Sequence, residues 1–379
     1  MRFPATRLFA LGLACMPFAA HPQIATQEHR VRIVTVASGL AHPWSLAFLP
    51  DGRMLVTERP GRLRVLAKDG SLDPKPVEGL PRIDAQGQGG LLDVAVHPDF
   101  GRNGWIYWTY AQRDADGMNG TELARGKLSG GPGNYRVEQA QVLFRMQPKS
   151  ASGLHFGSRL VFDRKGLLYM TLGDRREMQR AQDLGDHRGK ILRLTDEGKP
   201  APGNPFLDDG KARPEIFSYG HRNVQGAALH PRSGELWATE HGPQGGDELN
   251  RAVSGGNFGW PLVSYGCNYG DPVGDACRIG GGTHVPAYVE PVSFWVPISI
   301  APAGLIFYTG NGFAQWQGHA LMGALAGRAL WRIELDGNQE VGRERLLAEL
   351  DERIRDVEQG PDGWIYMLTD SGKLIQVRD

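Results

Sequence analysis

The residues with the clearest chemical potential in this chain are a histidine and an aspartate that flank predicted strands. His155 stands in the run LHFGSRLVFD, and Asp174 ends the run LYMTLGD. An imidazole whose ring is held by a carboxylate is suited to act as a general base. A structural role is the commoner explanation for any single histidine, so this pair needs support from its neighbours.

Two further segments carry polar residues that strand pairing does not require. In SYGHRNVQG, Arg222 and Asn223 place a cationic fork beside an amide, which suits the carbonyl and carboxylate groups of a planar ligand. A surface salt bridge would explain Arg222 equally well. In GQGGLLDVAVHPDF, Gln88 lies among glycines that would let a flat ligand approach the backbone, although a plain turn is the simpler explanation.

A fourth segment, EHGPQGGDELNRAVSGGNFGWP, is dense in glycine and acidic residues. Backbone carbonyls and carboxylates are the oxygen ligands that a hard cation takes. The spacing does not match an EF-hand loop, so the composition alone makes this segment a candidate calcium site of another kind.

The elements that must position these residues follow one repeated pattern, a tight turn and then short alternating strands. Six copies occur, at residues 53–66, 104–111, 167–194, 235–252, 319–335 and 361–377. Such a unit cannot bury both of its own faces, so the copies must stack, and radial stacking gives a six-bladed β-propeller. A β-sandwich is the alternative, but the copies are spaced more widely than hairpins. The N-terminal strand VRIVTVASG is a candidate to close the ring by pairing with the last blade.

The composition fits an all-β protein without a polyanionic partner. The 379 residues include 42 basic and 42 acidic side chains, so nothing favours nucleic acid or an anionic membrane surface. The 52 glycines and 25 prolines indicate many turns and disfavour long helices.

The N-terminus predicts export. Arg2 and Arg7 precede an apolar stretch at residues 8–20 that is too short to span a bilayer. We expect a signal peptide at 1–20, a single propeller domain at 21–379, no membrane span, and a periplasmic or secreted protein. A lipoprotein signal at Cys15 is a weaker alternative, because Gly12 stands where a leucine is expected.

Cleavage of that peptide would leave Cys267 and Cys277, which bracket one loop. In an oxidising compartment a disulfide is the natural interpretation, with two free thiols as the alternative.

Taken together, the runs GQGGLLDVAVHPDF, HFGSRLVFD, GHRNVQG, EHGPQGGDELN, NFGWP and ERIRDVEQGPDGWIYMLTD resemble the glucose/sorbosone dehydrogenase family, in particular its soluble aldose sugar dehydrogenase branch. They fall in order and cover almost all of the predicted mature chain. The resemblance implies a six-bladed propeller that uses pyrroloquinoline quinone (PQQ) and calcium to oxidise aldose sugars at C1 to lactones.

The resemblance also assigns roles to single residues. It implies that His155 is the catalytic base, that Asp174 orients it, and that Arg222 stabilises negative charge on the quinone. The implied cofactor-binding residues are Gln88, Arg222, Asn223, Tyr269, Arg353 and Arg355. The implied calcium-binding positions are Gly242 and Pro243 through their carbonyls, Glu248, and Phe258 through its carbonyl.

Two departures from the family pattern bear on these expectations. Relatives place a lysine where Ala326 stands, and Arg328 is a candidate to supply that charge instead. Glucose-specific relatives carry an aspartate just before the catalytic histidine, where this chain has Leu154, which favours a broader range of aldoses.

The sequence leaves the partners and two other functions open. The chain has no haem-attachment CxxCH, so we expect electrons to leave to a separate acceptor. The natural sugar and the oligomeric state stay undetermined. A non-enzymatic calcium-binding propeller and a calcium-dependent lactonase are the alternative functions.

Overall fold

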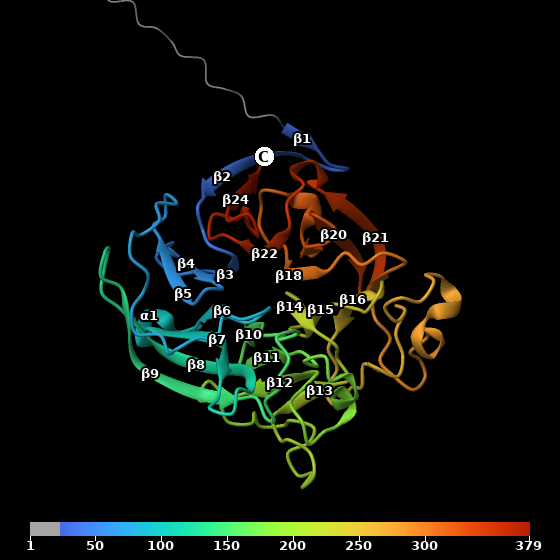
Figure 1. The fold of residues 1–379 in the computed structure, drawn as a ribbon. Helices are drawn as coiled ribbons and strands as arrows, with labels where there is room; N and C mark the ends of the chain where they lie inside the picture. The colour runs from blue at the N-terminus through green and yellow to red at the C-terminus, as the bar shows by residue number, and fades with distance from the viewer. Residues whose placement is uncertain (1–22) are drawn as a thin grey trace, which may run out of the picture.

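The computed structural model describes residues 23–379, and the predicted signal peptide lies outside these residues. Six antiparallel sheets stand around a common centre (Figure 1), which confirms the predicted six-bladed β-propeller. The six innermost strands contact one another in sequence order, and the last returns to the first.

Each blade begins at the centre and runs outward along the chain. The first blade comprises β3 (Pro43–Phe48), β4 (Met54–Glu58) and β5 (Arg62–Leu66). The second comprises β6 (Leu91–Val96), β7 (Trp105–Arg113), β8 (Asn119–Ser129) and β9 (Arg136–Arg145). The third comprises β10 (Leu160–Phe162), β11 (Leu168–Leu172), β12 (Lys190–Leu194) and β13 (Ile216–Tyr219). The fourth blade comprises β14 (Val224–Leu229), β15 (Leu236–Glu240), β16 (Asp247–Arg251) and β17 (Ser293–Trp295). The fifth comprises β18 (Pro302–Phe307), β19 (Ala320–Ala324), β20 (Ala329–Asp336) and β21 (Gln339–Leu346). The sixth comprises β22 (Ile354–Gln359), β23 (Ile365–Thr369) and β24 (Leu374–Arg378), with β2 (Arg30–Ala37) and β1 (Gln23–Ala25) added outside.

The helices between these strands are short. They are α1 (Phe100–Asn103) and the 3₁₀ turns η1 (Met178–Gln182), η2 (Asp275–Cys277), η3 (Ile279–Gly281), η4 (Ala314–Trp316) and η5 (Ala348–Leu350). Within residues 23–379, no helix has the length and apolar character needed to cross a membrane.

The ring is closed by the two ends of the chain, as the sequence predicted. Strand β2 pairs antiparallel with β24, with Ile33 opposite Val377 and Thr35 opposite Ile375. The N-terminal strand therefore completes a blade whose inner strands come from the C-terminus. This pairing gives β24 a hydrogen-bonded neighbour on each side.

The hydrophobic core is divided among the six interfaces between blades. Each of the six main clusters of buried side chains joins residues from two neighbouring sheets. Because both faces of a blade are covered, every residue is buried in the second strand of five blades, β4, β11, β15, β19 and β23.

A repeated threonine links the blades by hydrogen bonds. In four blades the second strand carries a fully buried threonine whose hydroxyl donates to a backbone carbonyl at or beside the inner strand of the next blade. The donors are Thr57, Thr109, Thr171 and Thr239, and the acceptors are the carbonyls of Leu92, Ser158, Val224 and Ala303. Each bond satisfies a polar group that would otherwise lie unpaired in an apolar interface.

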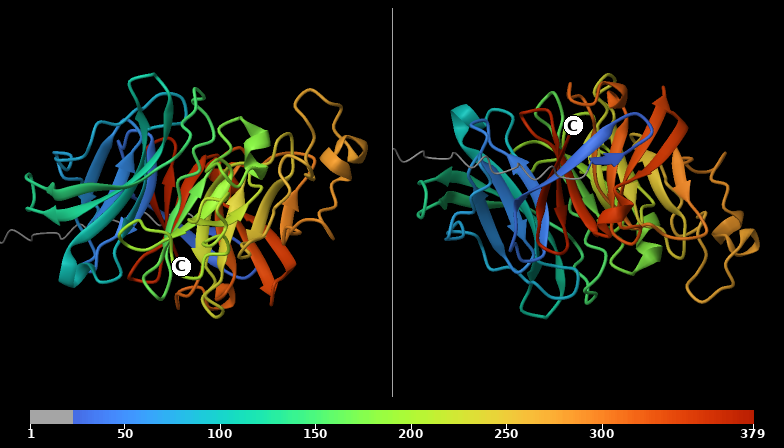
Figure 2. Two further views of the ribbon diagram at one scale, coloured as in Figure 1. Left: turned by 90° about the horizontal axis from the view of Figure 1, so that it is seen from below. Right: turned by 90° about the horizontal axis from the view of Figure 1, so that it is seen from above.

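One end of the ring collects the residues that the sequence singled out. In an antiparallel pair, the loop that enters the first strand and the loop that leaves the second lie at the same end. His155 and Arg222 lie in loops that enter inner strands, and Asp174 follows a second strand. The segment between β16 and β17, drawn in orange, extends outward from the rim of the ring (Figures 1 and 2).

Candidate active site

His155 and Asp174 are in direct contact. His155 Nδ1 lies 2.7 Å from Asp174 Oδ1, and the indole N–H of Trp260 donates to Asp174 Oδ2 at 2.8 Å. The backbone of His155 has a φ of 51° and donates its N–H to Gln88 Oε1 at 2.9 Å. His155 Nε2 has no hydrogen-bond partner among the described residues. The imidazole is thus held through one nitrogen while the other can accept a proton.

The surroundings of His155 favour its neutral form. Burial lowers the pKa of His155 below its ordinary value of 6.5, and the nearby Arg222 charge lowers it further. The hydrogen bond that His155 donates to Asp174 opposes this shift in pKa without cancelling it. A neutral imidazole at neutral pH is the form that a general base requires.

Arg175, which the sequence analysis did not single out, clamps the loop that carries His155. Its guanidinium is fully buried and donates to the carbonyls of Ser152 and Leu154 and to Asn119 Oδ1. It also lies 3.4 Å from the centre of the Phe156 ring, a cation–π contact. Asp174 therefore orients the ring of His155, while Arg175 fixes the backbone before His155 and packs on the Phe156 ring after it.

Two hollows open beside this histidine, and we call them the outer cleft and the inner cavity. The outer cleft has a volume of about 150 Å³ and is lined by His155, Asp174, Arg176, Met178, Arg222, Pro243, Trp260, Asn268 and Tyr269. The inner cavity has a volume of about 330 Å³ and is lined by Trp44, Arg59, Gln88, Leu92, Phe156, Gly157, Asn223, Gln225, His241, Ala301, Leu325, Arg353, Arg355 and Asp370. The two hollows adjoin, because neighbours in the sequence line different ones. His155 and Arg222 line the outer cleft, and the residues that follow them, Phe156 and Asn223, line the inner cavity.

The inner cavity has an excess of positive charge. Arg353 and Arg355 both pair with Asp370, at 2.8 and 3.1 Å, and Arg59 lines the same cavity. Three arginines thus face one carboxylate, and Arg59 Nε is buried without a hydrogen-bond partner. Burial lowers the pKa of Arg355, and the charges of Arg59 and Arg353 contribute to this lowering. An anionic ligand would balance this cluster.

Arg59 was also missed by sequence reasoning, although its position in the blade could have revealed it. It comes directly after the second strand of its blade, as His241, Leu325 and Asp370 do in theirs. All four line the inner cavity. In four of the six blades, the first residue after the second strand is therefore a signal that points to the site.

Arg222 and Asn223 are buried parts of the site. Arg222 is 5% exposed, so the alternative of a surface salt bridge is wrong. Its guanidinium donates to the His241 carbonyl at 3.1 Å and lies 3.4 Å from the Tyr269 hydroxyl. Asn223 Oδ1 accepts from the Gly157 N–H at 3.2 Å, which ties this loop to the one that carries His155.

The predicted calcium positions surround a third, very small hollow. Gly242, Glu248 and Phe258 line it together with Glu240, another residue that the sequence analysis missed, while Pro243 lies on the outer cleft. Burial raises the pKa of Glu248 well above its usual range, and repulsion from Glu240 adds to this shift. Two buried carboxylates that repel each other favour a cation between or beside them.

Side chains alone would not complete a metal site here. Among residues 23–379, no three histidine, cysteine, aspartate or glutamate side chains gather in the way that a metal ion requires. A cation in this place would therefore depend on backbone carbonyls in addition to carboxylates, as the sequence predicted for Gly242, Pro243 and Phe258.

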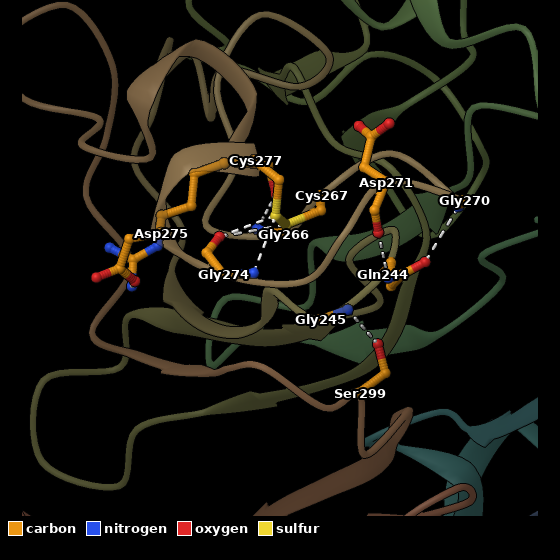
Figure 3. Close-up of a disulfide and its surroundings, with 12 residues drawn as sticks. Gln244, Gly245, Gly266, Cys267, Gly270, Asp271, Gly274, Asp275, Cys277 and Ser299 are labelled. Atoms are coloured by element: carbon orange, nitrogen blue, oxygen red, sulfur yellow. Dashed lines mark hydrogen bonds and ion pairs between the residues drawn. A yellow bond between two sulfur atoms is a disulfide. The ribbon is translucent and has the colours of Figure 1, made fainter.

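Cys267 and Cys277 form the predicted disulfide, with their Cα atoms 5.1 Å apart. The loop that it closes carries Asn268 and Tyr269 to the outer cleft. The side chain of Gln244 holds the same loop by two hydrogen bonds: it donates to the Asp271 carbonyl and accepts from the Gly270 N–H (Figure 3). Tyr269 lies on the outer cleft and not in the inner cavity.

Arg328, the candidate to supply the charge of the lysine missing at Ala326, does not reach the inner cavity in this structure. Arg328 is half exposed and pairs with Asp351 at 2.8 Å, and it does not line the inner cavity. The neighbouring Leu325 does line it, and its carbonyl accepts from Arg353 at 3.1 Å.

The comparisons with known proteins agree with this arrangement. Residues 40–376 match the family described as glucose/sorbosone dehydrogenase. The aldose sugar dehydrogenase YliI of Escherichia coli strain K12 is 42% identical over 372 residues, which cover 97% of either chain. A solved glucose dehydrogenase is 45% identical with a TM-score of 0.86, over 91% of this chain and 98% of that one. The PQQ-bound form of an aldose sugar dehydrogenase from Streptomyces coelicolor is 27% identical with a TM-score of 0.75, over 92% and 98%. This chain therefore belongs to the glucose/sorbosone dehydrogenase family.

Proposed function

We propose that this protein oxidises aldose sugars at C1 to lactones with PQQ and calcium as cofactors. The observation that carries the proposal is the His155–Asp174 pair, which stands between the outer cleft and a cationic inner cavity. A related aldose sugar dehydrogenase has been solved with PQQ bound, which supports the same cofactor here.

The inner cavity fits PQQ, a flat molecule with three carboxylates. Arg59, Arg353 and Arg355 exceed the charge of Asp370, so they can neutralise and orient an anionic ligand. Trp44 and Phe156 add buried aromatic surface to the same cavity. When bound, PQQ would supply a hydride acceptor and calcium would supply a Lewis acid.

The residues around Glu248 fit calcium. Glu240 and Glu248 are 4% and 7% exposed, and they share a hollow with the carbonyl-bearing residues Gly242 and Phe258. A hard cation would relieve the repulsion between these carboxylates and accept the carbonyl oxygens as further ligands. Pro243 would extend this ligand set towards the outer cleft.

His155 would hold the proton that leaves the sugar. Its Nε2 would take the proton from the anomeric hydroxyl, and Asp174 would stabilise the imidazolium that forms. Arg222, which lines the outer cleft next to Asn223 of the inner cavity, would stabilise negative charge that develops on the acceptor. Trp260 and Tyr269 would give the sugar ring apolar faces to pack against.

The remaining parts of the proposal rest on the sequence. Export to the periplasm or the medium follows from the apolar stretch at 8–20, and a separate acceptor must reoxidise the cofactor. The cleft would hold one sugar as a small-molecule substrate.

A panel of aldoses tests the proposed function directly. With PQQ and calcium added to purified protein, we expect several aldoses to reduce a redox dye and to yield the corresponding lactone, with KM values well above the micromolar range. The physical reason is Leu154, which offers an apolar side chain where a carboxylate would select one sugar. Strict preference for one sugar with a tight KM would contradict the expected breadth, and no oxidation of any aldose would contradict the function.

The pH dependence tests the role of His155. Because burial lowers the pKa of His155 below 6.5, kcat/KM is expected to stay high as pH falls and to decline only below 6.5, where the imidazole becomes protonated. Asp174→Asn removes a partner that raises this pKa, so the decline should move to still lower pH while kcat falls. Measured kcat/KM profiles of both proteins check this, and a decline centred above 6.5 in the wild type would contradict it.

A further inference from the structure

Arg176 is fixed at the outer cleft by the carboxylate that holds the catalytic histidine. Its backbone N–H donates to Asp174 Oδ1 at 2.8 Å, the oxygen that also contacts His155 Nδ1. Its φ is 62°, a left-handed conformation that turns the chain directly after the buried Arg175. Arg176 itself is exposed and lines the cleft. The backbone of Arg176 is therefore held in a defined place relative to His155, while its side chain stays free to meet a ligand.

The guanidinium of Arg176 has no hydrogen-bond or ion-pair partner among residues 23–379. The arginines nearest to it in the sequence are all occupied: Arg175 by three oxygen acceptors, Arg180 by Asp183, and Arg188 by Asp186 and Glu177. The carboxylate of Asp174, which also lines the cleft, is already shared by His155, Trp260 and the Arg176 N–H. Arg176 thus offers the cleft a cation that the protein itself does not neutralise.

A neutral sugar gives such a cation little to bind, because hydroxyl groups already exchange hydrogen bonds with water. A carboxylate gives it a bidentate, charge-assisted partner. In a sugar whose C1 lies at His155, an anionic group can reach Arg176 only from another carbon of the ring. Arg222, the other cation of the cleft, already contacts the His241 carbonyl and lies near the Tyr269 hydroxyl.

We propose that Arg176 makes the outer cleft a binding site for acidic aldoses, namely uronic acids, whose carboxylate it pairs with while C1 faces His155. The inference rests on the proposed function and names a substrate class for it. At C1 the O–H and C–H bonds break and the C=O bond of the lactone forms. The proton goes to His155, and the two electrons leave as hydride to PQQ, which the added redox dye reoxidises.

Paired substrates test the inference in protein loaded with PQQ and excess calcium. The pairs are D-glucuronate with D-glucose and D-galacturonate with D-galactose, and D-glucuronamide serves as an uncharged analogue of nearly the same shape. We expect a higher kcat/KM for each acid than for its neutral partner and for the amide. Arg176→Gln should lower the acid-to-neutral ratio roughly twofold to fivefold, the usual value of an ion pair made by an exposed side chain. Added salt should lower the wild-type ratio as well.

The matched control is Arg180→Gln, which removes an arginine paired with Asp183 a few residues away that does not line the cleft. This variant should keep the wild-type ratio. An unchanged ratio in Arg176→Gln, or an equal fall in both variants, would overturn the inference. A dependence on Arg176 seen with D-glucose 6-phosphate but with neither uronic acid would overturn the assignment to carboxylates.

Calorimetric titration separates this inference from the proposed function. Glucuronate should bind wild-type protein more tightly than glucuronamide, and Arg176→Gln should remove the difference. If that binding difference is found but no aldose is oxidised, the proposed function fails and the binding site stands. If aldoses are oxidised but the binding difference is absent, only the inference fails.

Discussion

Replacing His155 with alanine is expected to lower kcat by about 10²–10⁴-fold, or roughly 3–5 kcal/mol of barrier, which is the usual contribution of general-base catalysis. The structure gives the reason. Among the described residues, His155 is the only histidine that lines the outer cleft, a carboxylate holds its ring in place, and its second ring nitrogen is free to accept a proton. Binding of PQQ should change little, because the arginines of the inner cavity remain.

The measurement is kcat for wild type, His155→Ala and His155→Gln beside a titration with PQQ. His97→Gln is a suitable control, because His97 follows the inner strand β6 and so lies at the opposite end of the ring. Asp174→Asn should lower kcat less than His155→Ala, since it disturbs the orientation of the ring without removing the base. Near wild-type turnover in His155→Ala, or a loss of activity explained by lost PQQ binding, would show that the role is wrong.

Removal of PQQ and calcium is expected to abolish dye reduction, and restoring both should recover it, whereas either alone should not. The charges of the site carry this expectation. The excess of arginine in the inner cavity favours the binding of an anion, and the buried carboxylates of Glu240 and Glu248 favour the binding of a cation. Magnesium should restore less activity than calcium, because it dehydrates reluctantly and demands a stricter geometry than this irregular ligand set provides.

Chelation followed by dialysis and stepwise addition of each cofactor gives the measurement. Arg355→Gln should raise the Kd for PQQ roughly tenfold to a hundredfold, the cost of one charged hydrogen bond. Arg328→Gln is the matched control, because Arg328 pairs with Asp351 outside the inner cavity. Full activity in protein stripped of both cofactors would contradict the proposed function. Equal effects of the two arginine variants on the Kd for PQQ would contradict the assignment of PQQ to the inner cavity.

The architecture could be predicted from the sequence because its determinants are local. Alternation of side chains along each strand and the turn residues between strands repeat within each blade. The fully buried strand β11, for example, follows from LYMTL, and the pairing of β2 with β24 follows from one strand that lacked a partner. The disulfide was predictable for the same reason, since both cysteines stand in one loop.

Parts of the site could be found in the sequence only where a motif marks them. His155, Asp174 and Arg222 stand in distinctive runs, and the structure brings all three to one cleft. Arg175 stands beside Asp174 without a motif of its own, and Arg59 is marked only by its place after a second strand. Glu240 lies in the acidic segment that the sequence singled out, but nothing local separates it from the other carboxylates there. Arg328 shows the converse: its charge and its place in the sequence suit the site, but in the structure it pairs with Asp351 instead.

The sequence by itself therefore determined the blades, their order and the residue types available for acid–base chemistry and ion binding. Only the tertiary structure decided which of those residues meet. The inner cavity joins Arg59 of the first blade to Arg355 of the last, and these contacts depend on the closure of the whole ring. Burial then decides their electrostatics, since the pKa of His155 and the repulsion between Glu240 and Glu248 depend on the exclusion of water by residues distant in the chain.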